Sequence, residues 1–280
     1  MLKKILFASF IFTSLNTFAK YEPWNFNIIE VGIIKNNSLP NGFGPSEKDT
    51  IFEVQGTTRY NLLDLYWFVD RSNIFNDSDL SDKKNSDPNY VYAEFNPRIS
   101  IDGLIGKDLS IGPVNEWFLS YLFDYDNKRG FDYGKSLGIK KHYFGIGNYL
   151  NVPGFEYFKT NFYARYIERN YFRNEKKWDG FMLNASYGAT LYRFENGMKV
   201  GFSGWVDYVF GAKDSDTYNE YYSENQTTTS LQWQNQLRLF LNDNLSVSYT
   251  YQINHNFSEV HQYASGSNST AVGVHYSVTF

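Results

Sequence analysis

The chain has 280 residues, a formal net charge of -4 and a mean hydropathy of -0.48, and 20% of its residues are aromatic. After the first 20 residues it contains no apolar run that approaches the about 18–20 residues of a membrane-spanning helix, which excludes a helical membrane bundle. With no cysteine, it has neither a disulfide framework nor thiolate metal sites. The acidic balance offers no basic surface, so we expect no nucleic-acid partner.

The first residues have the features of a secretory signal peptide. Two lysines precede the apolar run Ile5–Phe12, and Thr17-Phe18-Ala19 places small residues before a cleavage site. We therefore expect residues 1–19 to be removed and residues 20–280 to form a single domain. A short membrane anchor is the alternative, but the apolar run is short for that role.

Beyond residue 20 the dominant hydrophobic period is two, in segments of about ten residues, which is typical of strands with one apolar face. In the segment 245–254, for example, an apolar residue alternates with Ser, Thr, Gln or Asn throughout. The pattern predicts twelve strands, at about residues 24–34, 49–60, 62–71, 90–101, 115–126, 137–149, 156–168, 178–192, 198–210, 228–241, 244–254 and 269–280.

The connections between these strands alternate in length. Short turns alternate with six long polar connections, near residues 35–48, 71–89, 126–135, 169–177, 212–227 and 255–268. The connection at 102–115 is the exception, because it is long although it lies on the rim that otherwise has short turns. An even number of strands, this asymmetry and a terminal Phe280 after alternating apolar residues are typical of an outer-membrane barrel. The sequence predicts an all-β fold, a twelve-stranded antiparallel transmembrane β-barrel in the bacterial outer membrane. Alternation alone would also fit a soluble sandwich.

The two faces of the predicted strands differ in chemistry. One parity collects aromatic residues such as Trp67, Phe162 and Tyr249, and we expect this face to contact lipid. The other parity should line a narrow lumen, and its rings, amides and charges of both signs suit a ligand with a flat ring and a polar sugar. The candidate ligand-binding residues are Glu53, Asp64, Tyr66, Phe68, Asp70, Glu94, Arg98, Phe118, Asn161, Tyr163 and Arg165.

Charges that share such a lumen should pair, because an isolated charge is costly to desolvate. Glu94 and Arg98 share the inward parity but lie four residues apart, about 13 Å at 3.3 Å per residue. Each should therefore pair across strands, with Arg165 or Asp124 as the candidates. The alternative interpretation is that the charges only brace the wall and the rings only fill it.

The central part of the chain carries specific motifs. The run Glu94-Phe95-Asn96-Pro97-Arg98-Ile99-Ser100-Ile101-Asp102 precedes Asp108-Leu109-Ser110-Ile111-Gly112-Pro113 and Glu116-Trp117. Shorter stretches are Gly42-Phe43-Gly44-Pro45, Asn161-Phe162-Tyr163-Ala164-Arg165-Tyr166 and Trp178-Asp179-Gly180. In these stretches, over about residues 40–190, the chain resembles the family of Tsx-type nucleoside-specific channels, which also holds the porin OmpK.

The resemblance implies a monomeric barrel whose narrow lumen passes nucleosides, surrounded by outer-membrane lipid and lipopolysaccharide. A nucleobase would then stack on Tyr66, Phe68 or Phe118. The chain departs from the family pattern at Gln55, Phe68 and Asn96, where two acids and a tyrosine are usual. Ring stacking survives the change at Phe68, whereas a hydroxyl contact to the sugar does not. The family's role as a receptor for phage or colicin depends on long loops, which match poorly here.

An enzyme is the main rival class, because twelve-stranded outer-membrane phospholipases exist. They need a serine and a histidine on adjacent strands, and none of His142, His255, His261 and His275 shares a recognisable motif with a serine. Metal binding by His255 and His261 is possible chemistry, but solvated loop histidines are the simpler interpretation. We predict no enzyme, cofactor or metal site. The remaining alternatives are a general small-solute porin and a surface receptor or adhesin whose lumen is filled by packed side chains.

Overall fold

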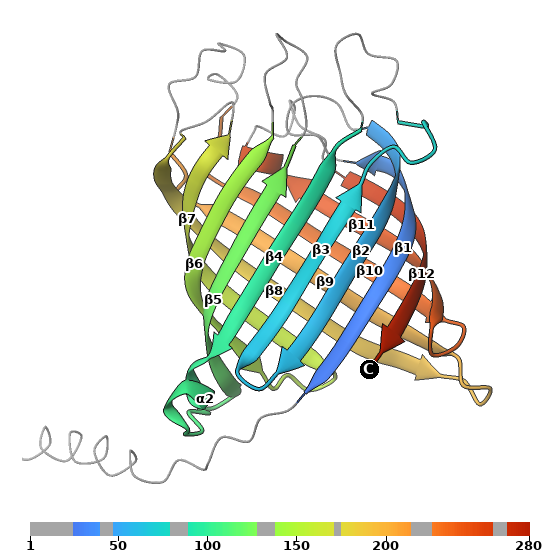
Figure 1. Cartoon of the computed structure of the whole chain (residues 1–280), viewed down its shortest axis with the longest axis horizontal. Helices are drawn as coiled ribbons and strands as arrows, with labels where there is room; N and C mark the ends of the chain where they lie inside the picture. Colours follow the sequence, from blue (N-terminus) through green and yellow to red (C-terminus); the bar gives the residue numbers. More distant parts are fainter. Residues whose placement is uncertain are drawn as a thin grey trace, which may run out of the picture.

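Twelve antiparallel strands form a closed barrel in the described part of the chain (Figure 1). The computed structural model describes residues 25–39, 47–78, 89–127, 138–170, 175–213, 226–259 and 268–280. The predicted fold class is confirmed. The strands are β1 (Phe26–Leu39), β2 (Glu47–Tyr60), β3 (Leu63–Arg71), β4 (Val91–Ser100), β5 (Val114–Asp126), β6 (Ile139–Leu150), β7 (Tyr157–Asn170), β8 (Lys177–Arg193), β9 (Lys199–Phe210), β10 (Ser230–Phe240), β11 (Leu245–His255) and β12 (Asn268–Thr279).

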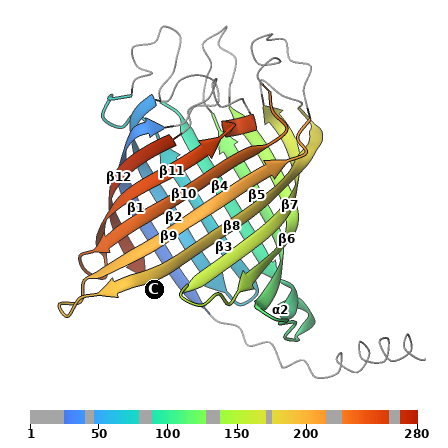
Figure 2. The same ribbon diagram turned by 180° about the vertical axis from the view of Figure 1, so that it is seen from behind.

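Pairing between the first and last strands closes the barrel. Ile28 lies opposite Thr279 and Asn36 opposite Ala271 in the antiparallel β1–β12 ladder, and the tilted strands surround the interior on both sides of the molecule (Figures 1 and 2). A closed sheet has no unpaired edge, so the backbone of the wall satisfies its own hydrogen bonds. The prediction ended the first strand too early, because β1 and β2 stay paired through a register shift after Asn36.

The unusually long connection between β4 and β5 is an ordered element. It begins with the short helix α2 (Ile101–Ile105), where the Ser100 side chain accepts the Gly103 backbone N–H and Gly106 ends the helix at a φ of 66°. The buried Asp102 carboxylate accepts the backbone N–H groups of Leu109 at 2.8 Å and Trp117 at 3.0 Å. This side chain therefore fastens the connection to the start of β5. None of the described helices is long and apolar enough to cross a membrane.

The burial pattern of the strands is the reverse of that in a soluble protein. Along β11, Ser246, Ser248 and Asn254 are buried, whereas Val247 is 37% and Tyr249 50% exposed. The barrel therefore places polar side chains inside and apolar ones outside, which suits a wall surrounded by lipid and excludes the soluble sandwich. The predicted inward parity holds for every candidate residue, since each shares its face with residues of the interior.

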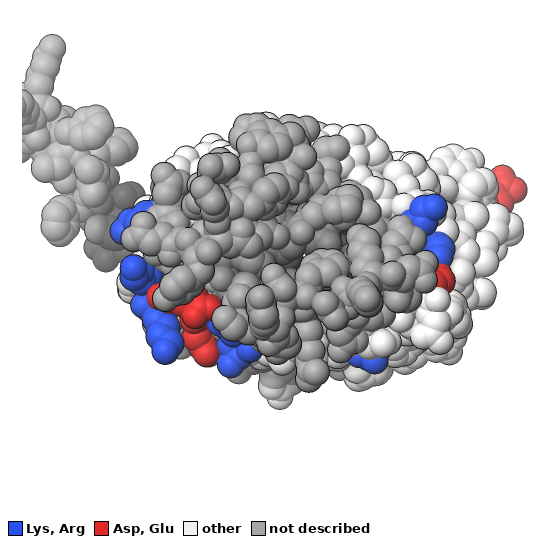
Figure 3. Space-filling model, turned by 90° about the horizontal axis from the view of Figure 1, so that it is seen from above, with Lys and Arg blue, Asp and Glu red and all other residues white. Residues whose placement is uncertain are grey.

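The predicted signal peptide, residues 1–19, and His261 lie outside the described residues, as do parts of all six long connections. All six long connections join strands at the end opposite α2. Seen from that end, the exposed charged side chains of the described residues lie at a few places along the rim (Figure 3).

The inverted burial makes a prediction about Leu119, which is 52% exposed on the outward face of β5 and near the middle of the strand. Leu119→Arg should lower the free energy of unfolding by about 2–4 kcal/mol, because it places a charge in the hydrocarbon region. Gln234→Arg, at a similar height but facing the lumen, is the matched control and should cost much less. Urea unfolding in lipid vesicles measures both changes. Equal losses would contradict the assignment of the two faces.

Candidate functional site

A cavity of 1780 Å³ occupies the interior of the barrel. Its lining includes Asp108 and Asn151 at the α2 end and Ser72 and Tyr90 at the other end, so the cavity follows the barrel axis. Seven predicted residues line it, namely Glu53, Tyr66, Phe68, Asp70, Glu94, Arg98 and Asn161. The other four are buried in the wall behind the lining, namely Asp64, Phe118, Tyr163 and Arg165.

Phe118 is not the open ring that its inward parity suggested. Its side chain is 0% exposed, and the guanidinium carbons of Arg98 and Arg59 lie 4.1 Å and 5.1 Å from the ring centroid. Tyr149 packs against the same ring edge-on, with centroids 5.4 Å apart. A nucleobase cannot reach Phe118 unless these groups move. The expected stacking role is therefore wrong, and the ring instead holds two guanidinium groups through cation–π contacts.

The basic residues near Phe118 pair with buried carboxylates. Arg98 Nε lies 3.6 Å from one Asp64 oxygen, and Lys159 Nζ donates to the other at 3.2 Å. Arg59 Nη2 donates to Glu116 at 2.5 Å. Arg98 thus pairs across strands as expected, but its partner is Asp64. The reason is register, because β3–β4 pairing places Asp64 directly opposite Arg98.

Glu94 differs from Arg98, because it forms no ion pair with any described residue. Its carboxylate accepts the Tyr92 hydroxyl, and the register places another acid, Asp124, opposite it. The expected partner Arg165 is engaged elsewhere, since its Nη2 donates to Glu259 at 2.7 Å. The expected pairing of Glu94 with Arg165 is therefore wrong. The Glu94 side chain instead lines the cavity.

Three rings form an aromatic strip along β3 and β4. The centroids of Tyr66 and Phe68 lie 6.0 Å apart, and those of Phe68 and Tyr92 lie 5.5 Å apart. All three rings line the cavity and are partly exposed. The register places Phe68 between Gln55 and Glu94. The strip therefore offers ring faces to the cavity with a carboxylate beside them.

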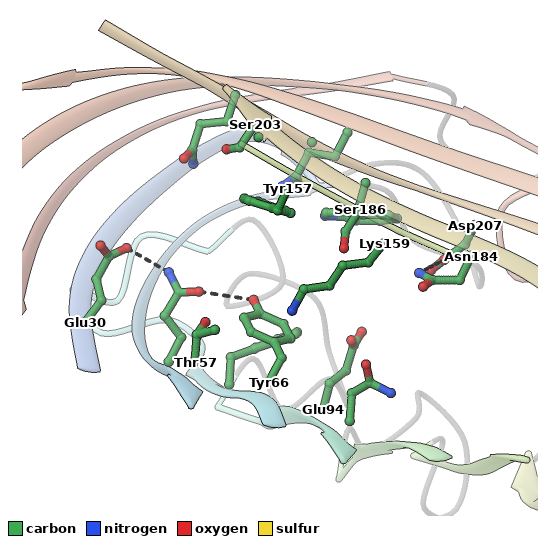
Figure 4. A pocket seen from close by; sticks show the side chains of 18 of the residues that line it. Glu30, Thr57, Tyr66, Glu94, Tyr157, Lys159, Asn184, Ser186, Ser203 and Asp207 are labelled. Atoms are coloured by element: carbon green, nitrogen blue, oxygen red, sulfur yellow. Dashed lines mark hydrogen bonds between the residues drawn. The ribbon is translucent and has the colours of Figure 1, made fainter. Parts of the chain in front are cut away.

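A hydrogen-bond chain holds the end of this strip. Glu30 on β1 accepts Gln55 Nε2 at 2.7 Å, and Gln55 Oε1 accepts the Tyr66 hydroxyl at 3.1 Å (Figure 4). Both terminal nitrogens of Arg238 donate to Glu30, at 2.6 Å and 2.9 Å. Sequence reasoning missed Glu30, although its place among alternating apolar residues in β1 marked it as inward.

His275 completes this chain from the side of β12. Its Nδ1 lies 3.2 Å from Glu30, and its Nε2 lies 2.8 Å from the Ser248 hydroxyl. The ring fits against two glycines, since a Cβ on Gly32 or Gly273 would lie 2.8 Å or 2.6 Å from a ring nitrogen. Side chains at these two positions would therefore displace the ring from Glu30.

The opposite wall supplies mostly polar groups. Asn184 Nδ2 donates to Asp207 at 2.7 Å, and Ser186 lies beside this pair (Figure 4). Lys159 extends its amino group across the cavity toward the wall of Tyr66 and Glu94 (Figure 4). The two walls thus face each other, with several carboxyl groups and rings on one and amides, hydroxyls, an amine and the single carboxyl of Asp207 on the other.

Part of the connection after β11 also enters the interior. The short helix η2 (Phe257–Glu259) brings Phe257 and Glu259 to the cavity lining. Glu259 is 2% exposed, and its ion pair with Arg165 crosses from η2 to β7. The backbone of this turn is fixed as well, because the Thr227 N–H donates to the Glu259 carbonyl at 2.9 Å. The ion pair between Arg165 and Glu259 narrows the barrel interior near the end with the long connections.

One group of described residues has the composition of a metal site. Ligand atoms of Glu30, Glu53 and His275 lie within 4.8 Å of one another. Arg238 already donates two hydrogen bonds to Glu30, so a cation would meet a guanidinium group in place of a free carboxylate. The arrangement therefore fits an ion pair better than a metal ion.

Comparison with known proteins identifies the family of the chain. The model of the family described as "Nucleoside-specific channel-forming protein, Tsx" matches residues 32–280. The chain belongs to this family. The match extends beyond residues 40–190, over which the motifs were visible, to the last strand.

Individual relatives are moderately similar to the chain. An outer membrane protein OmpK of Vibrio parahaemolyticus is 37% identical over 172 residues, 61% of this chain and 60% of the relative. A nucleoside-specific channel-forming protein Tsx of Salmonella typhimurium is 28% identical over 180 residues, 63% and 61% of the two chains. The chain thus spans about three fifths of these relatives. The solved KdgM porin is 10% identical, with a TM-score of 0.42 over 89% of this chain and 98% of the porin.

The buried pair of Arg59 and Glu116 makes a stability prediction. Glu116→Gln should lower the free energy of unfolding by about 3 kcal/mol, because it removes the carboxylate that accepts a hydrogen bond from a buried guanidinium. The matched control is Glu156→Gln, whose partner Arg193 is 4.0 Å away with both side chains largely exposed. That change should cost less than about 1 kcal/mol. Urea titration of both variants in vesicles measures the two losses of unfolding free energy. Similar losses in the two variants would refute the role of the buried pair.

Proposed function

We propose that this protein is an outer-membrane channel through which nucleosides diffuse, with the aromatic strip Tyr66, Phe68 and Tyr92 as the binding surface for the base. The observation that carries this proposal is the combination of an axial cavity with partly exposed rings and with carboxyl groups at its wall that form no ion pair among the described residues. The family to which the chain belongs supports the same class of solute. The proposal includes no enzymatic step.

The strip and its surroundings match the two parts of a nucleoside. A base can stack on the Phe68 face regardless of its identity, because every base has a π-face. Ribose hydroxyls are donors, and the carboxylates of Glu53, Asp70 and Glu94 beside the strip are acceptors. The Asn161 and Asn184 amides on the facing wall can meet the donors and acceptors at the base edge. A pore for simple ions needs no such rings.

The cavity also weighs against one alternative. A surface receptor that transports nothing would be expected to fill its lumen with packed side chains, as in the smallest barrels. The interior instead keeps 1780 Å³ open between its walls. Roles of the long connections in binding phage or colicin fall on residues outside the description. A general porin remains the alternative that the conductance experiment must separate.

The direct test is conductance of the purified barrel in a planar bilayer, titrated with adenosine and thymidine. Small unitary currents that fall at rising nucleoside concentration would support a binding site in the pore. Glucose is the control solute, because it has the hydroxyls of a sugar without a base. Equal block by glucose and adenosine would favour a general porin, and the absence of current would favour a receptor.

Phe68 should carry much of the affinity for the base. Phe68→Ala should weaken nucleoside block by about 5- to 100-fold, since base stacking on a ring contributes about 1–3 kcal/mol and about 1.4 kcal/mol corresponds to tenfold. Phe95→Ala is the control, because Phe95 lies on the same sheet but is 44% exposed on the lipid face. Block measured in the two variants should differ by that factor. If both retain the wild-type value, the base does not bind at this strip.

Gln55 should act on the nucleoside only through the Tyr66 hydroxyl. Gln55→Leu and Tyr66→Phe each remove one side of the 3.1 Å hydrogen bond, and each should weaken nucleoside block several-fold by freeing the ring. The double variant should be no worse than either single variant, because interacting residues are non-additive. The constants for nucleoside block in the wild type, the two single variants and the double variant give the interaction energy between Gln55 and Tyr66. Strictly additive losses would mean that Gln55 contacts the nucleoside itself.

A further inference from the structure

The connection between β4 and β5 exposes three large aliphatic side chains. We refer to residues 101–113 as the α2 connection. Within it, Leu104 is 54%, Ile105 50% and Ile111 68% exposed. The tips of three other turns at this end are polar, namely Asn61, Glu195-Asn196-Gly197 and Asn242-Asp243-Asn244. A group of exposed apolar residues in one short connection indicates a contact with lipid or with another protein.

Hydrogen bonds hold the α2 connection in place. The Asp102 carboxylate fastens its first half to the start of β5. In its second half, Ile111 and Val114 exchange two backbone hydrogen bonds, at 2.9 Å and 3.0 Å. The Asn151 N–H donates to the Pro113 carbonyl at 2.7 Å and so joins this turn to the next one. The apolar side chains therefore cannot fold back onto the wall unless these bonds break.

The two sides of the α2 connection differ in polarity. Asp102 and Asp108 line the cavity, so the polar side faces the opening of the pore. The three exposed aliphatic residues do not line the cavity. Leu104 follows Asp102 by two residues, which is about 200° around a helix of 3.6 residues per turn. Leu104 therefore points away from the barrel interior, and the connection is amphipathic.

The α2 connection begins beside the membrane interface. Tyr60, the last residue of β2, is 69% exposed on the outward face. Exposed tyrosines at the ends of barrel strands lie at the level of the lipid headgroups. The Ser100 N–H donates to the Leu62 carbonyl at 2.9 Å, so α2 starts next to the turn that follows Tyr60. In both views α2 stands below the end of β5, at the side of the barrel and not across its opening (Figures 1 and 2).

We propose that the α2 connection is an interfacial anchor that inserts Leu104, Ile105 and Ile111 into the periplasmic leaflet of the outer membrane. The short turns of outer-membrane barrels face the periplasm, so this leaflet surrounds the α2 end. Amphipathic helices at such an interface bury their apolar face about 5–10 Å into the boundary between headgroups and acyl chains.

Lipid is the partner because the exposed aliphatic residues continue a surface that already faces lipid. Ile99, two residues before the start of α2, lies opposite Leu119 on the outward face of β4 and β5. Leu119 is itself 52% exposed. The phospholipid that covers this pair therefore also reaches the beginning of the α2 connection. This proposal does not depend on the passage of nucleosides.

The test is electron paramagnetic resonance of single nitroxide labels, because the chain contains no cysteine and each label can occupy one introduced cysteine. Leu104→Cys and Ile111→Cys report on the α2 connection. Leu119→Cys reports on the lipid face, and Asn196→Cys on an exposed polar turn at the same end. The labelled barrel is placed in vesicles of phosphatidylethanolamine and phosphatidylglycerol, with two relaxation agents on both sides of the membrane.

The two agents distinguish hydrocarbon from water. Molecular oxygen concentrates among the acyl chains, whereas a water-soluble nickel chelate is excluded from them. The ratio of the oxygen effect to the nickel effect should be several-fold higher at positions 104 and 111 than at position 196. It should stay below the ratio at position 119, which lies deeper in the hydrocarbon. The heat-dependent migration of each variant on SDS gels confirms that the barrel is folded.

A second experiment tests whether the native side chains, and not the label, hold the connection in the leaflet. With the label at position 111, Leu104→Ser/Ile105→Ser should lower the ratio several-fold, toward the value at position 196. Leu241→Ser is the matched control, because Leu241 is 38% exposed in the turn between β10 and β11 at the same end. This control should leave the ratio at position 111 unchanged.

Three results would overturn the proposal. Equal ratios at positions 104, 111 and 196 would mean that the α2 connection lies in water. Low accessibility of positions 104 and 111 to both agents would mean that a second copy of the chain covers them. An unchanged ratio in Leu104→Ser/Ile105→Ser would mean that these side chains do not anchor the connection.

Discussion

The closure of β1 onto β12 is the constraint on which the rest of the structure depends. Within lipid no water is present to satisfy a free backbone group, so a sheet can cross only when its last strand pairs with its first. The ladder from Ile28–Thr279 to Asn36–Ala271 meets that requirement. Closure also encloses an interior space. The apolar side chains point away from this space, because the hydrophobic surface of the wall faces lipid. The polar half of each strand is then forced into one shared interior.

That shared interior explains why the lumen contains so many ion pairs. A charge that enters it loses water, and a nearby opposite charge is the cheapest compensation. Arg98 with Asp64, Arg59 with Glu116 and Arg165 with Glu259 follow this rule. Glu94 does not, since the described residues give it only a hydroxyl donor. The exceptions to pairing, and not the charges in general, are therefore the positions where a solute with hydroxyl groups can be expected to bind.

The sequence alone could predict the direction in which a side chain points, but not whether the side chain is accessible from the cavity. A hydrophobic period of two residues indicates which side chains point inward, and it placed all eleven candidate residues on the correct face. Whether a ring is open depends on what packs on it, and the arginines that cover Phe118 come from β2 and β4. Pairs such as Arg238 with Glu30, 208 residues apart, depend on the register of several ladders and on closure. A pattern along one strand contains none of this information, which is why Glu30 was missed and Glu94 was given the wrong partner.

The different chemistry of the lumen and of the lipid face also follows from that period of two. On β6, Lys141 and Tyr143 face the lumen, while Lys140 and His142, one residue before each, face the lipid. Neighbouring residues thus meet different media, and a slip of one residue in pairing would exchange them. Because the backbone separates the two sets, a charge removed at Lys140 leaves the walls around Tyr66 and Phe68 unchanged. A substitution on the lipid face should therefore leave the binding of a solute in the lumen unchanged.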